Sequence, residues 1–421
     1  IVIMTKCRIS KEDLSVVLDL GDIYLNNFLK KKDVKAPKGK LRIGFGKKSK
    51  LVQLLDTANQ DKLYKNYWYR SGTNKTMTDQ LRQIVDTVPY WVSLKPNDVV
   101  LDIGCNDGTL LKNYKKFGNF HRIGIDPATN IAKEGKKNCE SHSVSFFDKK
   151  VFFKLSRKKA KVITSIAMFY DLDNPSKFVS DINNCLDDNG IWIMQLSYTP
   201  LMMSLNAFDN IIHEHIEYYT LESIIPLLKK NNLEIVDAEV NDVNAGSLRL
   251  TIKKKKNELQ ATANFTKEIG KLRLKSLIMY EKKLQYGKKK TYINFKKNID
   301  TQKNSLLRLL IKIKKQKKIV LGYGASTKGN TLLQYYGIDE KLLPGIAERQ
   351  KQKVGLLTVG SWIPIISEEQ MRKKKPDYLL VLPWQFIHEF IVREEDFLKR
   401  GGKFIVPLPK VKIIGYGDIK I

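Results

Sequence analysis

The sequence predicts an α/β protein with two Rossmann-like, doubly wound sheets behind a small β-rich unit. Two segments carry this prediction, residues 98–111 and 317–334. Each reads as a buried strand, a glycine-containing turn and the start of a helix. Apolar strands alternate with helical segments after both turns, which is typical of parallel sheets. The chain is therefore expected to carry two α/β domains.

Four consecutive units are expected from the order of these patterns. The first is short and turn-rich, the second and fourth alternate strands with helices, and the third is polar and helical. In the second unit, helical spacing at 77–92 precedes expected strands at 98–103, 121–127, 144–148, 160–170 and the end of 175–198. The predicted boundaries are 1–75 for the N-terminal domain, 76–252 for the first α/β domain, 253–316 for a helical connector and 317–421 for the C-terminal α/β domain.

The composition indicates a folded protein of the cytoplasm. Apolar residues make up 42% of the 421 residues, which is enough for sizeable cores. We find no run of about eighteen apolar residues, so no membrane partner is expected. The N-terminal residues lack the apolar region of a signal peptide. The four cysteines are far apart in the sequence (Cys7, Cys105, Cys139 and Cys185), which favours a reduced compartment.

The formal net charge of +31 requires nucleic acid to be considered as a partner. The excess is mostly lysine, it is spread along the whole chain, and it is densest at 252–318. We favour solvated helix faces over a dedicated groove, so nucleic acid is not the expected partner. A phosphorylated small substrate would also benefit from this charge.

The first glycine turn contains the candidate cofactor site. Its pattern is D-x-G-x-N-x-G, formed by Asp102, Gly104, Asn106 and Gly108. An acid before the first glycine would repel a pyrophosphate, but it suits the amino group and sulfonium of S-adenosylmethionine (SAM). About 24 residues after Asp102, Asp126 ends the next strand, where an acid can bind both ribose hydroxyls. The spacing therefore predicts a SAM site.

Several segments together resemble a known family. "VVLDIGCNDGTLL" is similar to the first motif of class I methyltransferases. "FDNIIHEHIEYYTLE", "NDVNAGSLRL" and "GYGASTKGNTLL" resemble the sugar-nucleotide C-methyltransferases, and the resemblance runs from about Cys7 to Pro409. It implies an N-terminal zinc-binding unit, a central class I methyltransferase domain and a C-terminal α/β domain. It also implies a nucleoside-diphosphate 4-keto-6-deoxysugar as the substrate that receives a methyl branch.

The resemblance also implies functional residues. It places the cofactor at the first glycine turn, a catalytic pair at Glu214 and His215, and a tyrosine within "NYWYRSG". Tyr69 is the first choice for that tyrosine and Tyr67 is the second. The family histidine after the fourth strand is replaced by Asp171 in this chain.

The N-terminal unit departs from the family pattern. The family has two CxxC pairs, whereas this chain has Cys7 and Ser10 in the first and Gly46 and Ser49 in the second. One thiolate cannot build a tetrahedral zinc site, which needs four ligands. We expect zinc to be absent and this domain to be held by packing.

Three interpretations of His213-Glu214-His215 remain open: a zinc site, polar residues at a strand end, and acid–base work, which we favour. Carbon methylation needs a base because a sugar C–H is not nucleophilic until a neighbouring ketone allows it to become an enolate. Histidine titrates near neutral pH, so His215 is the expected base. Glu214 would orient it or hold the sugar, and Tyr69 would hydrogen-bond the enolate oxygen. His213 would pack structurally.

Further substrate contacts are expected near these motifs, each with a structural alternative. Asn244 and Ser247 either contact substrate or form a simple turn. Tyr323 and Lys328 in "GYGASTKG" either bind the diphosphate or form a fold-determining turn. The aromatic residues expected to wall the pocket are Tyr198, Phe208, Tyr218 and Tyr219. The chain is expected to be a monomer or a weak homodimer.

Two other functions each agree with one feature of the sequence. A nucleic-acid methyltransferase would fit the charge, but residues 168–175 lack the D/N-P-P-aromatic segment of amino-group methylases. The chain also has no Pro-Cys dipeptide for cytosine C5 chemistry. A SAM-binding protein without catalysis is suggested by the lost zinc ligands, but the His-Glu-His segment argues against it.

Overall fold

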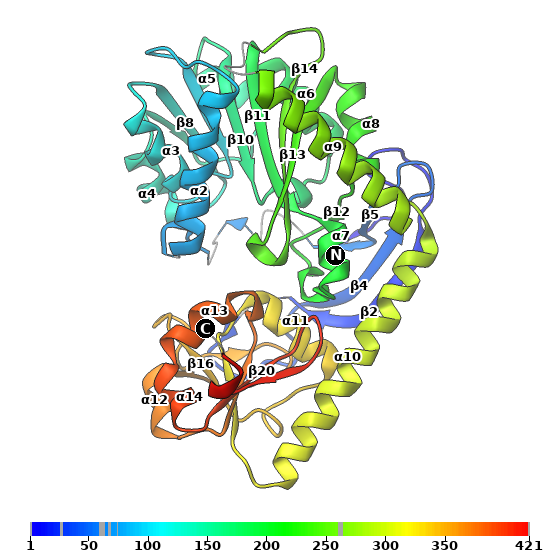
Figure 1. Cartoon of the computed structure of the whole chain (residues 1–421), viewed down its shortest axis with the longest axis vertical. Helices are drawn as coiled ribbons and strands as arrows, with labels where there is room; N and C mark the ends of the chain where they lie inside the picture. Colours follow the sequence, from blue (N-terminus) through cyan, green and yellow to red (C-terminus); the bar gives the residue numbers. More distant parts are fainter. Residues whose placement is uncertain are drawn as a thin grey trace.

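The computed structural model describes residues 2–25, 28–58, 64–65, 69–73, 75–259 and 264–419. The alternative tyrosine Tyr67 therefore lies outside the described residues. An upper lobe and a lower lobe each contain one α/β sheet, and two long helices connect them along one side (Figure 1). Within the described part of the chain, no helix is long and apolar enough to cross a membrane.

The N-terminal unit is an antiparallel sheet that borrows a strand from the middle of the chain. Its order is β12-β5-β4-β2. The strands are β2 (Ser15–Tyr24), β4 (Lys38–Phe45), β5 (Val52–Leu54) and β12 (Glu217–Tyr218). Strand β12 follows the His-Glu-His segment directly, and Glu217 pairs with Gln53 while Tyr218 pairs with Val52. The candidate catalytic segment is thus anchored to the N-terminal domain.

Two small pairings complete this region. Strand β1 (Val2–Ile3) pairs with β6 (Asp56–Thr57), and β3 (Phe28–Leu29) pairs with β17 (Leu357–Thr358) of the C-terminal domain. The N-terminal unit therefore contacts both α/β domains.

The central domain has a seven-stranded sheet of order β13-β14-β11-β10-β7-β8-β9. Strand β14 is antiparallel to both neighbours, and the pairs between β11 and β9 are parallel. The strands are β7 (Val99–Ile103), β8 (His121–Ile125), β9 (Ser141–Ser143), β10 (Ala160–Ile166), β11 (Leu186–Ser197), β13 (Leu233–Asn241) and β14 (Ser247–Lys254). The strand expected at 144–148 is wrong by a few residues, because β9 ends at Ser143 before the chain turns toward α5.

Helices cover this sheet on both faces, as expected for a doubly wound domain. They are α2 (Lys75–Thr87), α3 (Thr109–Lys112), α4 (Ala132–Lys137), α5 (Lys149–Leu155), α6 (Pro175–Cys185), α7 (Thr199–Ser204) and α8 (Leu221–Lys230). Short 3₁₀ turns lie at 71–73, 88–90, 113–116, 129–131, 169–171, 208–210 and 243–245. Every residue of β7 is buried, which fits its unbroken apolar sequence.

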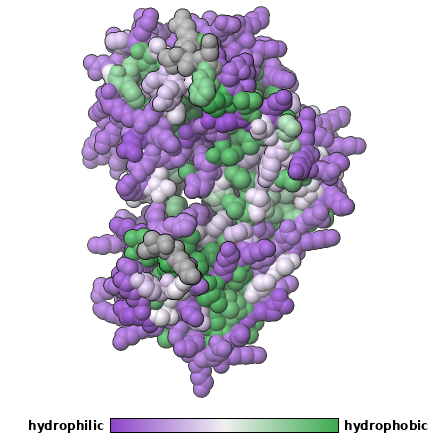
Figure 2. Space-filling view, in the orientation of Figure 1, coloured by the Kyte–Doolittle hydropathy of each residue, from purple (hydrophilic) through white to green (hydrophobic). Residues whose placement is uncertain are grey.

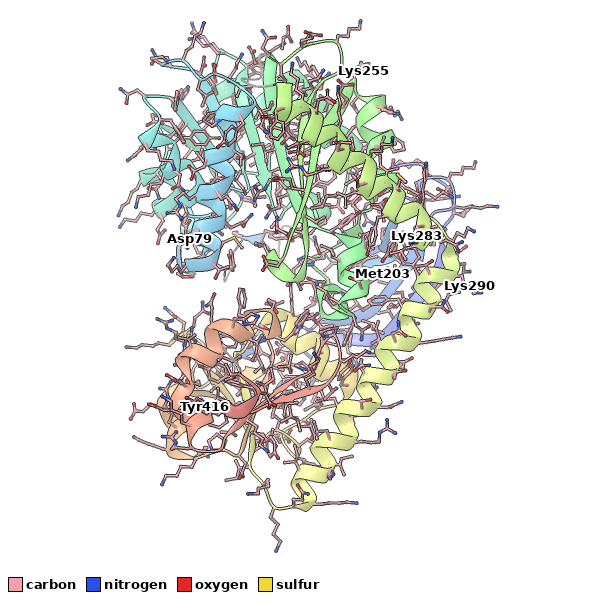
Figure 3. The ribbon with its side chains drawn as sticks, in the orientation of Figure 1. Asp79, Met203, Lys255, Lys283, Lys290 and Tyr416 are labelled. Atoms are coloured by element: carbon pink, nitrogen blue, oxygen red, sulfur yellow. The ribbon has the colours of Figure 1, made fainter. Side chains whose placement is uncertain are left out.

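The connector consists of α9 (Asn264–Leu284) and α10 (Lys289–Lys315). Apolar residues on α10 recur at helical spacing and are buried: Tyr292, Phe295, Ile299, Leu306, Leu310 and Ile313. Lys283 and Lys290, beside the bend between the helices, project into solvent (Figure 3). The view in Figure 2 shows hydrophilic residues over most of this face, with hydrophobic residues gathered between the lobes and on the lower lobe.

The C-terminal domain is a second doubly wound sheet of order β18-β16-β15-β19-β20-β21. Its strands are β15 (Val320–Tyr323), β16 (Ile346–Glu348), β18 (Ile365–Ser367), β19 (Tyr378–Val381), β20 (Lys403–Val406) and β21 (Lys412–Ile414). Its helices are α11 (Thr327–Tyr336), α12 (Glu368–Lys373), α13 (Ile387–Arg393) and α14 (Glu395–Lys399), with 3₁₀ turns at 384–386 and 416–418. All pairs except β20–β21 are parallel, so both α/β domains predicted from the glycine turns are present.

Candidate active site

The turn after β7 has the backbone shape that a close-approach loop needs. Gly104 and Gly108 have φ angles of +72° and +76°, a region that disfavours other residues. A Cβ on Gly108 would lie 2.7 Å from the Cβ of Asn138, so even alanine would clash. Another residue would be strained at both φ angles, and at Gly108 its Cβ would also clash with Asn138.

Two acids frame this turn. Asp102 is buried at the end of β7 and accepts a 2.6 Å hydrogen bond from the Thr164 hydroxyl. Burial raises the pKa of Asp102 to about 7. A cationic ammonium group placed beside this desolvated carboxyl would stabilise its ionised form. Asp126 follows β8 and accepts hydrogen bonds of 2.8 Å from the backbone N–H groups of Asn106 and Ala128. These residues fit the amino-acid and ribose ends of SAM.

The Asp126 assignment leads to a test of cofactor binding. We expect Asp126→Ala to weaken SAM binding by roughly 1–3 kcal/mol, because two charge-assisted hydrogen bonds to the ribose would be lost. Isothermal calorimetry measures this directly, with Asp188→Ala as a control because Asp188 is an exposed carboxylate of the same domain. Unchanged SAM affinity in Asp126→Ala would remove the assignment.

The segment that carries Tyr69 is tied to the same turn. The Asn106 side chain donates to the Tyr69 carbonyl at 3.1 Å and accepts from the Ser71 N–H at 3.0 Å. The Asp107 carboxylate accepts from the Gly72 N–H at 2.7 Å. Partial burial and Asp107 raise the pKa of Tyr69, so its phenol stays protonated and can donate a hydrogen bond. Sequence reasoning missed Asp107, although an acid just before a helix start is a capping signal.

The turn after β10 connects the cofactor loop to the histidine segment. Met168 lies directly against Gly104, where an added Cβ would be 3.2 Å from the Met168 Cγ. Two residues later, the Tyr170 ring meets the His215 ring edge-on with centroids 4.5 Å apart. His215 therefore lies next to the carboxyl end of the sheet, where ligands of open α/β sheets bind.

His215 is held in one tautomer. Its Nδ1 lies 2.9 Å from the carbonyl oxygen of Asn210, so Nδ1–H donates and Nε2 keeps its lone pair. Burial and the nearby Lys328 ammonium lower the pKa of His215 to about 3. The imidazole is therefore uncharged at neutral pH and Nε2 can accept a proton, but a pKa this low makes it a weaker base than the near-neutral histidine that the sequence predicts. His213, by contrast, is fully buried, with Nε2 3.2 Å from the Ile23 carbonyl of the N-terminal sheet.

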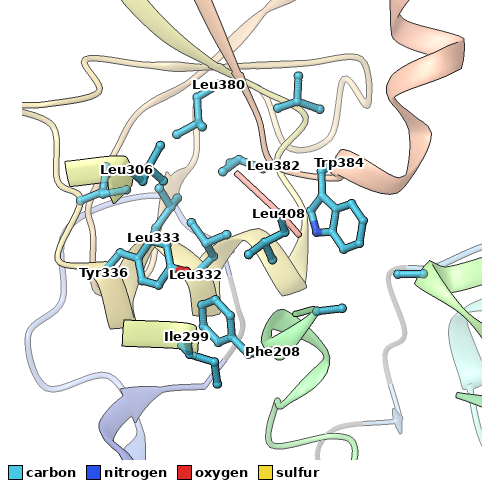
Figure 4. Packing of buried hydrophobic residues seen from close by; sticks show 14 of the residues in the cluster. Phe208, Ile299, Leu306, Leu332, Leu333, Tyr336, Leu380, Leu382, Trp384 and Leu408 are labelled. Carbon is cyan, nitrogen blue, oxygen red and sulfur yellow. The ribbon is translucent and has the colours of Figure 1, made fainter. Parts of the chain in front are cut away.

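Polar and aromatic side chains of the C-terminal domain contact this segment. The Lys328 ammonium donates to the Asn210 side-chain oxygen. The Trp384 indole N–H donates to Asp209 at 3.0 Å. Phe208 stacks on Tyr336 of α11 with ring centroids 5.1 Å apart, in the packing cluster shown in Figure 4. Burial lowers the pKa of Lys328, and the Asp209 carboxylate opposes that shift.

Three residues predicted to contact the substrate have hydroxyl groups that already hydrogen-bond within the protein. Tyr198 is fully buried and donates to Glu281 at 2.6 Å. Tyr323 donates to Glu394 at 2.9 Å and to Glu368 at 3.0 Å. Ser247 donates to the Val243 carbonyl at 2.8 Å. These bonds favour structural roles, and the substrate contacts of the three residues stay predictions.

The remaining residues predicted to contact the substrate or wall its pocket include Tyr218, Tyr219 and Asn244. Tyr218 and Tyr219 are buried, and their hydroxyls donate to the His215 carbonyl and to Glu217. These hydrogen bonds hold the candidate catalytic segment in place. Asn244 is half-buried in the turn between β13 and β14 and has a φ of +55°. This left-handed conformation fits the simple-turn alternative and leaves Asn244 as a prediction.

The residues at the family's zinc position do not fit zinc. Within the described ranges, no group of three His, Cys, Asp or Glu residues could hold a metal ion. Cys7 instead donates to the Ser49 hydroxyl at 3.3 Å. An added Cβ on Gly46 would lie 2.4 Å from the Ser49 oxygen, so a cysteine there would require the Ser49 side chain to move.

A carboxylate connects the two loops instead. Glu12 accepts 2.8 Å hydrogen bonds from the N–H groups of Lys48 and Ser49 and from the Ser10 hydroxyl. Although burial raises the pKa of Glu12, these bonds outweigh it and lower the value to about 2. Ionised Glu12 therefore holds both loops together.

This arrangement predicts a pH-dependent stability. The Glu12 pKa is lowered on folding, so its stabilising contribution is present above about pH 4.5 and is lost as the pH falls toward 2. We expect Glu12→Gln to lower the free energy of unfolding by about 1–2 kcal/mol at pH 7, allowing for solvent screening. The difference should shrink below pH 4 in denaturant titrations. Asp13→Asn, at an 81% exposed carboxylate, is the control. An equal loss at pH 7 and pH 2.5 would contradict this role.

Family models match the two α/β domains separately. A model described as the C-methyltransferase C-terminal domain matches residues 242–409, and one described as a methyltransferase domain matches residues 73–238. Together the two matched models support a SAM-dependent C-methyltransferase enzyme. It is similar to the C-methyltransferase NovU of Streptomyces niveus, with 26% identity over 366 residues that cover 86% of this chain and 85% of that protein.

Solved methyltransferase structures are similar to a smaller part of this chain. Magnesium protoporphyrin IX methyltransferase from Synechocystis PCC 6803, with bound SAM, is 14% identical with a TM-score of 0.30, covering 42% of this chain and 77% of that one. A SAM-dependent methyltransferase from Clostridium acetobutylicum is 15% identical with a TM-score of 0.33, covering 43% and 93%. The matched methyltransferase model and the sheet order together confirm the predicted class I fold of the central domain.

Proposed function

We propose that this C-methyltransferase acts on a nucleoside-diphosphate 4-keto-6-deoxysugar and places a methyl branch on the ring carbon next to the ketone. One observation carries the proposal: His215 presents an uncharged Nε2 between the cofactor turn and the C-terminal domain. A base at this position suits a substrate whose carbon must lose a proton before it can attack an electrophile. SAM, when bound, supplies that electrophilic methyl group.

The residues around His215 suggest a division of roles. Nε2 of His215 takes the acidic ring proton, while the Nδ1–H bond to Asn210 keeps the ring oriented. Glu214, half-buried beside it, orients the sugar. The protonated phenol of Tyr69 hydrogen-bonds the enolate oxygen. This hydrogen bond stabilises charge that develops only during the reaction.

Lys328 supports the nucleotide-sugar part of the proposal. It lies at the start of α11 and reaches across to Asn210, so its ammonium lies where the two α/β domains meet. A diphosphate is the part of such a substrate that attracts a desolvated cation. We therefore assign the diphosphate to the C-terminal side of the site and the sugar to the His215 side.

The deciding experiment is a substrate panel. The protein is incubated with SAM and with 4-keto-6-deoxysugars carried on dTDP or GDP, and products are read by mass spectrometry. We expect a gain of one methyl group on a sugar nucleotide and none on total RNA added in a parallel reaction. Methylated RNA would favour the nucleic-acid alternative. SAM binding in calorimetry with no methylated product would favour a binding protein without catalysis.

A further inference from the structure

Two carboxyl groups lie together beside the proposed base. Asp171 belongs to the 3₁₀ turn after β10, and Glu214 immediately precedes His215. The Tyr64 hydroxyl hydrogen-bonds the Asp171 carboxyl and donates to the Glu214 carbonyl at 3.3 Å. The same turn places Met168 against the cofactor loop and Tyr170 against the His215 ring. Asp171 is therefore built into the element that joins cofactor and base.

The surroundings of Asp171 favour its protonated form. Burial raises its pKa well above the usual value, and the neighbouring carboxyl groups of Glu214 and Glu217 raise it further, whereas the Tyr64 hydrogen bond opposes the shift. Tyr218, from β12, faces the same two carboxyls, Asp171 and Glu214. No cation among the described residues offsets these effects. Two neighbouring carboxyls in a desolvated place do not both ionise, and the raised pKa of Asp171 places the proton there.

One oxygen of Asp171 has no partner. Its Oδ1 is buried and makes no hydrogen bond to the described residues. An unpaired buried oxygen is unfavourable, and buried polar groups are nearly always paired in folded proteins. A protonated carboxyl with an open oxygen beside a base is suited to donate a hydrogen bond to a ligand oxygen.

We propose that Asp171 is a second hydrogen-bond donor to the carbonyl oxygen of the substrate and acts as a neutral carboxylic acid. This inference rests on the proposed function, because it needs a ketone next to the reacting carbon. As His215 removes the ring proton, negative charge moves onto the ketone oxygen, and the Asp171 O–H shortens its hydrogen bond to it. The Asp171 proton stays on Asp171 when the carbonyl re-forms, so no bond at this residue is made or broken. Tyr69 and Asp171 together form the oxyanion site.

The protonation state is tested first, in the ligand-free full-length protein. Carboxyl ¹³C NMR of aspartate-labelled protein, with the signal assigned by Asp171→Asn, should show Asp171 protonated at pH 7. Asp173→Asn is the control, because Asp173 lies two residues away and is 65% exposed. An Asp171 signal that is ionised at pH 7 would overturn the proposal, whatever the enzyme methylates.

Kinetics then test the donor role. An amide can also donate, so Asp171→Asn should keep turnover within about 10-fold of wild type, while Asp171→Ala should lose roughly 10²–10³-fold. Wild-type turnover should fall as the pH rises through the Asp171 pKa, and this alkaline loss should be absent in Asp171→Asn. Equal melting temperatures show that the variants fold. If Asp171→Asn is as slow as Asp171→Ala, or if it retains the alkaline loss, the donor role is wrong. If wild type methylates no keto sugar, the proposed function fails and the donor role fails with it.

Discussion

Replacing His215 with alanine should reduce turnover by roughly 10²–10⁴-fold while leaving SAM and sugar-nucleotide binding nearly intact. In the proposed mechanism Nε2 of His215 takes the ring proton, and the structure holds that ring uncharged and in one tautomer. The variant should also fail to exchange the acidic ring proton of the sugar with deuterium. Proton abstraction precedes methyl transfer, so deuterium exchange reports on the abstraction step alone.

The measurement is deuterium wash-in at the ring carbon, with S-adenosylhomocysteine in place of SAM to stop the reaction after deprotonation. His213→Asn is the matched control, since His213 contacts the Ile23 carbonyl and not the site. It should retain exchange if it folds. Normal exchange in His215→Ala would assign the proton to another group and would end the proposed mechanism, although the methyltransferase class would stand.

Replacing Lys328 with methionine should change both the pKa of His215 and the use of the sugar nucleotide. Its ammonium contributes to the low pKa of His215, so the pKa of His215 should rise in the variant. It should remain below 6.5, because burial is the larger cause and is unchanged. A histidine NMR titration of the ligand-free protein follows this shift directly. The kcat/KM for the sugar nucleotide should fall about 10–10²-fold if Lys328 binds the diphosphate.

Lys341→Met serves as the control for this change of charge. Lys341 is exposed in the same domain, so both His215 titration and kcat/KM should be unaffected. A Lys328→Met protein with an unchanged His215 pKa would contradict the electrostatic coupling. A shifted pKa with an unchanged kcat/KM would instead remove Lys328 from the diphosphate site.

The cofactor turn and both α/β sheets could be predicted from the sequence because each depends on consecutive residues. A strand, a glycine turn and a helix follow one another within 98–111, and the acid at Asp126 ends the very next strand. Local patterns of this kind are set by backbone conformation and periodicity. The same reasoning could not separate Tyr198 and Tyr323 from true site residues, since burial and hydroxyl partners depend on Glu281 and Glu394, far along the chain.

The sequence by itself determined the class of chemistry: a SAM-type turn, a histidine beside an acid, and zinc positions that lack their cysteines. Only the tertiary structure decided which groups act on that histidine. Lys328 meets Asn210 across 118 residues, and Glu217 joins Gln53 of the N-terminal sheet. The protonation of His215, Asp171 and Glu12 follows from such contacts, because a pKa depends on burial and on neighbouring charges that the linear order does not contain.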